Sequence, residues 1–194
     1  MKALAVFALF STILLAAAPE VHPEVPRKGS AFGVQTGQDK YIWLNQYAGK
    51  TVVLAFILTD CSHCQFTTGV LNRIQADYAD RGVEVLASAI EIMSSLHIPD
   101  FVAKYRPNFP LGYDPQDYAT TFLGYPDNYP MVLPQILFID RTGVIRAQFA
   151  GDDPKLMKDV QEKTLRETLD RLLAEKTLAE KKGQTAAGPS APKK

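Results

Sequence analysis

The sequence predicts an α/β domain in which a central mixed β-sheet is flanked by helices, so that the fold has three layers. Two patterns carry this prediction. An apolar run, a helical segment and a second apolar run follow one another between residues 52 and 90, in the order of a βαβ unit with parallel strands. Two later apolar runs enclose a short turn and predict an antiparallel hairpin.

The βαβ unit is the most clearly marked part of the chain. Residues 52–58 form an apolar run without alternation and rich in β-branched side chains, which is typical of a strand buried on both faces. A helix should follow and end at Gly82, because four apolar residues lie four positions apart on one helical face. These residues are Phe66, Val70, Ile74 and Tyr78. The segment GVEVLASAI then supplies the second strand.

The rest of the domain follows from similar patterns. Residues 98–105 and 116–123 predict two further helices, the second more weakly marked. PQILFID and GVIRAQFAG predict the hairpin, with its turn at residues 140–143. From Pro154 to about Lys182 the pattern is again helical, with Leu165, Leu169 and Leu172 on one face.

Length and composition restrict the class of protein. The 194 residues suit one domain with tails, and two cysteines are too few for a disulfide-rich scaffold. The 21 basic residues are balanced by 21 acidic ones, so the chain lacks the positive excess that a nucleic-acid binder uses to neutralise phosphates.

The ends of the chain divide into three segments around a domain at residues 31–182. Residues 1–18 predict an export signal, since one Lys precedes an apolar run that closes on small residues. An uncleaved membrane anchor stays open as an alternative. Residues 19–30 are a Pro-rich polar linker, and residues 183–194 predict a disordered tail. The protein is therefore expected outside the cytoplasm, in the periplasm or secreted, where disulfides persist.

The two cysteines, Cys61 and Cys64, stand in the segment CSHC where the first strand passes into the helix. A structural disulfide closing so short a loop would add only about 2 kcal/mol. A thiol at a helix N-terminus, however, faces unpaired N–H groups and the positive end of the helix dipole, which favour the thiolate. Cys61 is thus predicted to attack a partner disulfide and Cys64 to resolve the mixed disulfide.

This CxxC motif, the later PQILFIDRTGVIR hairpin and the export signal together resemble the thioredoxin-like, extracytoplasmic thiol-disulfide oxidoreductases of the TlpA/ResA type, in the redoxin superfamily. The likeness runs from about residue 31 to 173. It implies a thioredoxin fold with an N-terminal β extension, no dissociable cofactor, and a monomer. The implied partners are protein dithiols or disulfides and an upstream redox protein.

The same resemblance assigns roles to three further residues. Pro134 would be the cis-proline beside the cysteine pair, and Leu133 would present its backbone to an extended substrate; a trans proline on an edge strand is the alternative. Glu91 stands where relatives carry an acid that moves protons to and from the cysteines. A solvated loop acid is the alternative for Glu91.

The residues around the first cysteine leave the direction of electron flow open. His63 could donate a hydrogen bond or positive charge toward the Cys61 sulfur, which would make the disulfide more oxidising, as in DsbA-like oxidases. His63 could equally be a solvated helix residue. Asp60 replaces the usual Trp, and its charge should oppose the thiolate. The family likeness favours a reductase, and His63 favours an oxidase.

Two other functions are alternatives to disulfide exchange. A peroxiredoxin is disfavoured, because Leu54 and Leu58 stand where its signature has Pro and Thr. A copper chaperone would use the two cysteines with His63 or His97, although related copper carriers space their cysteines one residue wider. A binding module that has kept the fold without turnover is a third possibility.

Overall fold

The computed structural model describes residues 23–186, so the predicted export signal, the start of the predicted linker and the last eight residues lie outside the described part. The described residues form eight strands in one sheet, flanked by four α-helices. The strands are β1 (Arg27–Lys28), β2 (Gly33–Gly37), β3 (Lys40–Trp43), β4 (Thr51–Ile57), β5 (Val83–Ala89), β6 (Leu111–Tyr113), β7 (Gln135–Ile139) and β8 (Val144–Phe149). The helices are α1 (Ser62–Tyr78), α2 (Ser94–Tyr105), α3 (Gln116–Leu123) and α4 (Gln161–Ala186), with 3₁₀ helices η1 (Leu44–Tyr47), η2 (Ala79–Arg81) and η3 (Pro154–Leu156).

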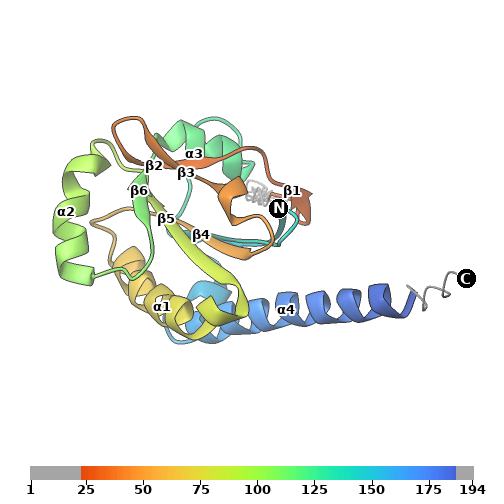
Figure 1. Cartoon of the computed structure of the whole chain (residues 1–194). Helices are drawn as coiled ribbons and strands as arrows, with labels where there is room; N and C mark the ends of the chain where they lie inside the picture. The colour runs from red at the N-terminus through yellow and green to blue at the C-terminus, as the bar shows by residue number, and fades with distance from the viewer. Residues whose placement is uncertain (1–22, 187–194) are drawn as a thin grey trace, which may run out of the picture.

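The sheet has the strand order β1-β8-β7-β4-β5-β6-β2-β3 (Figure 1). β4 lies inside it, parallel to β5 and antiparallel to β7. Helix α1 connects the parallel pair, and β7 and β8 form an antiparallel hairpin. The predicted βαβ unit, the predicted hairpin and the mixed character of the sheet are therefore confirmed.

Every residue of β4 is buried, which explains why its sequence does not alternate. Val53, Ala55 and Ile57 pack into the core on one side of the sheet, while the residues between them pack into the core on the other side. Fully burying each large side chain stabilises the fold by roughly 1.5–3 kcal/mol, so β4 anchors both cores.

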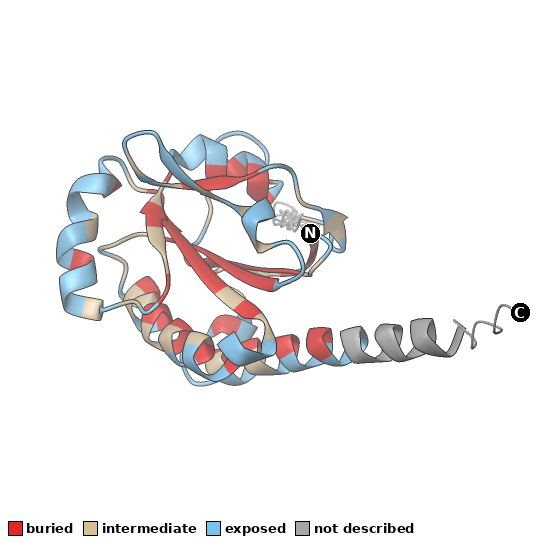
Figure 2. Cartoon of the chain, in the orientation of Figure 1, coloured by how far each residue is buried: buried red, intermediate tan, exposed pale blue. Residues whose placement is uncertain are grey.

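Helices cover the two faces of the sheet and complete the three predicted layers (Figure 1). α1 and α4 lie on one face, and Figure 2 shows buried positions along both helices. The predicted leucines Leu165, Leu169 and Leu172 are buried there. α3 covers the other face together with the N-terminal strands, and Phe32 packs there against Phe122. Within residues 23–186, no helix is both long and apolar enough to cross a membrane.

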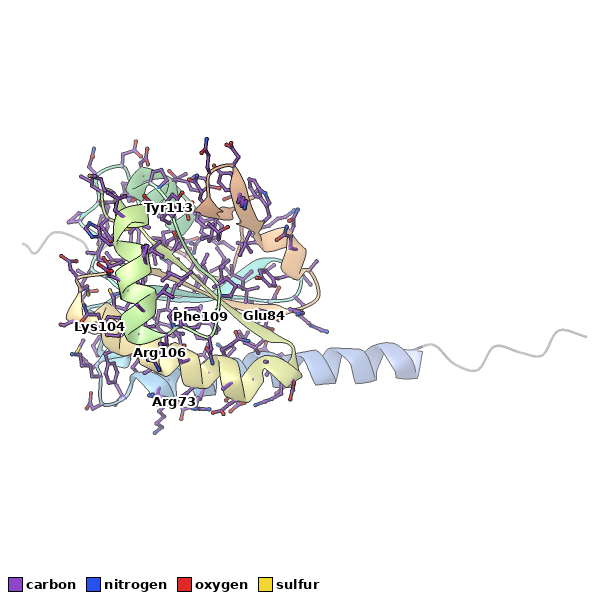
Figure 3. All side chains as sticks on the ribbon, turned by 60° about the vertical axis from the view of Figure 1, so that its left-hand side comes forward. Arg73, Glu84, Lys104, Arg106, Phe109 and Tyr113 are labelled. Carbon is purple, nitrogen blue, oxygen red and sulfur yellow. The ribbon has the colours of Figure 1, made fainter. Side chains whose placement is uncertain are left out.

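Helix α2 is attached to α1 at its C-terminal end, which Lys104 and Arg106 mark in Figure 3. The side-chain amide of Asn72 donates to the Arg106 carbonyl at 3.2 Å, and its oxygen accepts from the Asn108 N–H at 2.9 Å. Phe101 is the large apolar residue of α2 that the core buries.

Several predicted boundaries shift. The fold begins before residue 31, because Arg27 and Lys28 of the predicted linker form β1 on β8, and the Arg27 guanidinium donates to the Leu123 carbonyl at 2.8 Å. α4 starts at Gln161 rather than Pro154: Asp153 caps the short helix η3 first, through the Lys155 N–H at 2.8 Å. The last helix also continues to Ala186, into the segment predicted as tail.

Candidate active site

The site lies where β4 passes into α1, and Cys61 is the residue that begins the helix. Its backbone is extended (φ −78°, ψ 117°), so it precedes the first helical residue, Ser62. The Cys64 N–H donates to the Cys61 sulfur at 3.3 Å. A backbone donor at a helix N-terminus thus faces the sulfur, and such a donor stabilises a negative charge.

The two cysteines differ in their surroundings, although both are free thiols. Cys61 is half-buried, whereas the side chain of Cys64 is fully buried. Burial, followed by the hydrogen bond with Cys61, raises the pKa of the Cys64 thiol well above its ordinary value. Cys61 is therefore the more accessible of the two residues, and burial favours the protonated form of the Cys64 thiol.

The loop before β7 is the second side of the site. The Leu133–Pro134 peptide bond is cis, and the Leu133 carbonyl oxygen lies 3.9 Å from the Cys61 sulfur. The Gly151 N–H donates to the Val132 carbonyl at 3.0 Å, and a Cβ on Gly151 would overlap the carbonyl oxygen of Leu133. The sequence interpretation did not identify Gly151, whose only signal is that a glycine closes the predicted segment GVIRAQFAG.

Glu91 follows β5 and reaches the same end of the sheet. One carboxylate oxygen accepts from the N–H of Thr59, at 3.1 Å, and from the Thr59 hydroxyl. The other oxygen is buried and has no hydrogen-bond partner within the described residues. Thr59 is two residues before Cys61, so the structure brings Glu91 close to the cysteine segment.

His63 forms a hydrogen bond that the sequence did not predict. Its Nε2 lies 2.9 Å from the carbonyl oxygen of Leu156, which is 93 positions away in the chain. The fully buried Gln161, at the start of α4, lies 3.5 Å from the same nitrogen and also bonds to Thr67. The Nε2 of the ring is thus bonded to η3 and α4 rather than to the Cys61 sulfur.

The remaining candidates lie beside the cysteines. Asp60 is exposed and, together with His97, lines a pocket of about 190 Å³ between α1 and α2. Across residues 23–186, no group of three or more His, Cys, Asp or Glu side chains is arranged to hold a metal ion.

Comparisons with known proteins agree with this geometry. The thiol-disulfide oxidoreductase ResA of Bacillus thuringiensis subsp. konkukian is 26% identical over 132 residues, covering 68% of this chain and 73% of the relative. ResA of Geobacillus thermodenitrificans is 29% identical over 108 residues, covering 56% of this chain and 59% of the relative.

Solved structures show the same fold. A proposed thiol:disulfide interchange protein DsbE from Chlorobium tepidum superposes with a TM-score of 0.65 at 22% identity, covering 78% of this chain and 99% of the other. A thiol:disulfide interchange protein from Bacteroides sp. superposes with a TM-score of 0.59 at 17% identity, covering 76% and 91%. The predicted thioredoxin-like α/β fold is therefore confirmed.

Fold and cysteine pair define the class: this is an oxidoreductase of the redoxin type. Within that class, the chain belongs to the AhpC/TSA family, which its residues 25–148 match.

Proposed function

We propose that the protein exchanges disulfides with protein thiols outside the cytoplasm, with Cys61 as the attacking sulfur and Cys64 as the resolving one. The unequal surroundings of the two sulfurs carry this proposal. Cys61 combines partial exposure with a backbone donor at a helix start, whereas Cys64 is sealed and keeps its proton. The names of the ResA relatives support the same reaction.

The reaction has two steps. The Cys61 thiolate attacks one sulfur of a partner disulfide, the partner S–S bond breaks, and the other partner sulfur leaves as a thiolate that takes up a proton. Cys64 then loses its proton and attacks the Cys61 sulfur, which releases the partner as a dithiol. The protein ends with a Cys61–Cys64 disulfide, so two electrons have passed to the partner. An upstream dithiol protein restores the reduced pair.

Glu91 is proposed as the acceptor of the Cys64 proton. Its second carboxylate oxygen is buried without a hydrogen-bond partner in the described chain, and its first is anchored on Thr59. A carboxylate held in this way can take up a proton without first losing another bond. Glu91→Gln should slow the second step and leave the first unchanged. Equal rates for the second step in both proteins would reject this role.

Leu133 and Pro134 are proposed to bind the partner. The Leu133 carbonyl lies 3.9 Å from the Cys61 sulfur, so the backbone of this loop borders the sulfur that reacts. An extended segment of the partner would lie along this backbone, with its disulfide over Cys61.

Trapping separates the two cysteine roles. Cys64→Ser should accumulate mixed disulfides on Cys61, because the resolving sulfur is missing, while Cys61→Ser should form none and lose insulin reduction. Non-reducing gels and peptide mass spectrometry measure both. Equal trapping by the two variants would overturn the assignment. Copper bound to the purified wild-type protein, without disulfide turnover, would favour the copper-carrier alternative.

The favoured direction is reduction of the partner, in line with the ResA relatives, with a DsbA-like oxidase as the alternative. A glutathione titration of the Cys61–Cys64 pair measures its reduction potential and decides between them. His63→Ala should lower that potential if the ring stabilises the thiolate; an unchanged potential would exclude this role.

Export through residues 1–18 completes the proposal. Fractionation of cells that produce the full chain should place the protein outside the cytoplasm. N-terminal sequencing should find a start near Pro19 if the segment is cleaved, and at the original start if it is a retained anchor.

A further inference from the structure

Three large apolar side chains between β5 and the second turn of α2 are unusually exposed to solvent. Ile92 is 90% exposed, Met93 63% and Leu96 64%. Within residues 23–175, no other large apolar side chain is more than 44% exposed. Contiguous apolar surface on a soluble protein is characteristic of an interaction site. We call these three residues the apolar turn.

The backbone of the apolar turn is well defined. Met93 adopts a left-handed conformation (φ 60°, ψ 25°), which is unfavourable for a residue with a side chain. The Ser94 N–H donates to the Glu91 carbonyl at 3.1 Å, and the Leu96 N–H donates to the Met93 carbonyl at 2.9 Å. The apolar side chains are thus displayed by a turn whose backbone bonds are made.

The apolar turn lies at the same end of the sheet as Cys61. Glu91, which precedes it, bonds to the N–H of Thr59 at 3.1 Å. Thr59 is two residues before Cys61, so their Cα atoms are at most about 7.6 Å apart. On the other side, His97 and Asp60 line one pocket. In Figure 1, α2 stands beside the loop that joins β4 to α1.

A protein that reacts with Cys61 must cover this region. A standard protein interface takes about 800 Å² from each partner, which corresponds to a disc of roughly 16 Å radius. Because Cys64 is buried, the partner sulfur has to meet Cys61, and an interface of that size around Cys61 extends over the end of the sheet at which the apolar turn lies. A small thiol compound bound at Cys61 is too small to contact the apolar turn at the same time.

We propose that the apolar turn is a docking element for the protein with which Cys61 exchanges a disulfide, and that this partner carries apolar side chains beside its reactive cysteine. The proposal rests on the proposed function and adds what the partner surface must offer. The pocket beside Asp60, between α1 and α2, is lined by charged residues of both signs, Asp60, Asp100 and Lys104. A mixed rim of this kind suits a protein surface rather than lipid tails.

The test compares a protein disulfide with a small one. The variant Ile92→Ser/Met93→Ser/Leu96→Ser changes only exposed side chains, and thermal unfolding verifies that it folds. Its rate constant with insulin should fall about tenfold, which corresponds to about 1.4 kcal/mol of lost apolar contact. Its rate constant with oxidised glutathione should stay within about twofold of wild type, because glutathione does not span the surface.

The control is Tyr41→Ser, compared with Leu96→Ser alone. Tyr41 is 42% exposed on β3, at the far edge of the sheet, and its removal should leave both rates unchanged. Unchanged insulin reduction in the triple variant would overturn the docking role, and so would an equal loss with both substrates. A wild-type protein that reacts with neither substrate would instead refute the proposed function.

Two other occupants of the apolar turn would be visible in separate measurements. Sedimentation of wild type as a dimer that the triple variant converts to a monomer would overturn the proposal in favour of a second copy of the chain. Binding of wild type, but not of the variant, to phosphatidylcholine–phosphatidylglycerol vesicles would overturn it in favour of a membrane surface.

Discussion

The two ends of the central strand β4 differ in how completely their polar groups are bonded. At its N-terminal end, the Asp140 carboxylate accepts from the N–H groups of Thr142 (2.9 Å) and Val144 (3.1 Å) and from the Arg146 guanidinium (3.2 Å). Lys50 pairs with Glu84 there at 2.6 Å. These four charged side chains have partners inside the chain.

At the C-terminal end of β4, several groups have no partner within the described chain or are open to solvent. Cys61 is half-exposed, one oxygen of Glu91 is buried without a hydrogen-bond partner in residues 23–186, and the apolar turn lies open. Cavity size does not identify the cysteine site, since the pocket beside Asp60 has about 190 Å³, whereas a cavity lined by α3 and the loop after it has about 750 Å³. Polar and apolar groups that have no partner in the described part of the chain identify the reactive site better than cavity volume does.

The largest effect is expected for Gly151→Ala at the reactive end. The new Cβ would overlap the Leu133 carbonyl oxygen and lie 3.0 Å from the Pro134 nitrogen, and these backbone atoms cannot rotate away. We expect a loss of about 3 kcal/mol in the free energy of unfolding. Insulin reduction should fall about tenfold, since Leu133 borders the Cys61 sulfur. Urea unfolding and the insulin assay measure the two effects.

The second effect concerns Asp114, which accepts from the Ser88 hydroxyl at 2.6 Å and stands just after β6. Burial raises the pKa of this carboxyl from 3.8 to about 6. The folded state therefore binds a proton more tightly than the unfolded state, so the wild type loses stability as the pH rises from about 4 through 6.

Asp114→Asn removes this titration. Between pH 4 and pH 7, the free energy of unfolding of the wild type should fall by about 2 kcal/mol relative to the variant. Urea unfolding of both proteins at several pH values measures the difference. A difference that stays constant with pH would contradict the assignment.

Asp140→Ala tests the N-terminal end of β4, where the polar side chains are hydrogen-bonded. Loss of the turn hydrogen bonds should lower the free energy of unfolding by about 1–2 kcal/mol, because the Thr142 and Val144 N–H groups lose their acceptor. Insulin reduction measured below the unfolding transition should match the wild type. A clear loss of activity in the folded variant would show that the two ends are coupled.

The smallest effect is expected for Gly143→Ala, in the turn between β7 and β8. The residue has φ +82°, but a Cβ there would have no atom within 4 Å. Alanine would only have to adopt the left-handed backbone conformation that glycine adopts freely, which should lower the free energy of unfolding by about 1 kcal/mol. The same substitution as at Gly151 should thus produce a smaller loss of stability and no change in insulin reduction. Equal effects at the two glycines would contradict the comparison.

Local patterns in the sequence were sufficient for the main elements. The apolar run at residues 52–58 predicted the strand that is buried on both faces, and side chains four positions apart predicted α1. Even the weakly marked helix at residues 116–123 has the bounds of α3. The cysteine pair at the start of a helix also followed from sequence alone, since both the motif and the helix start are encoded by neighbouring residues.

The tertiary structure decided which distant residues complete the site. His63 bonds to the Leu156 carbonyl, Gly151 packs against Leu133, and Arg27 joins β8 and the end of α3. These contacts use backbone groups or a missing side chain, and they join segments far apart in the chain. Hydrophobic periodicity reports which side of an element faces the core, and it carries no information about which remote backbone group will meet a polar side chain there.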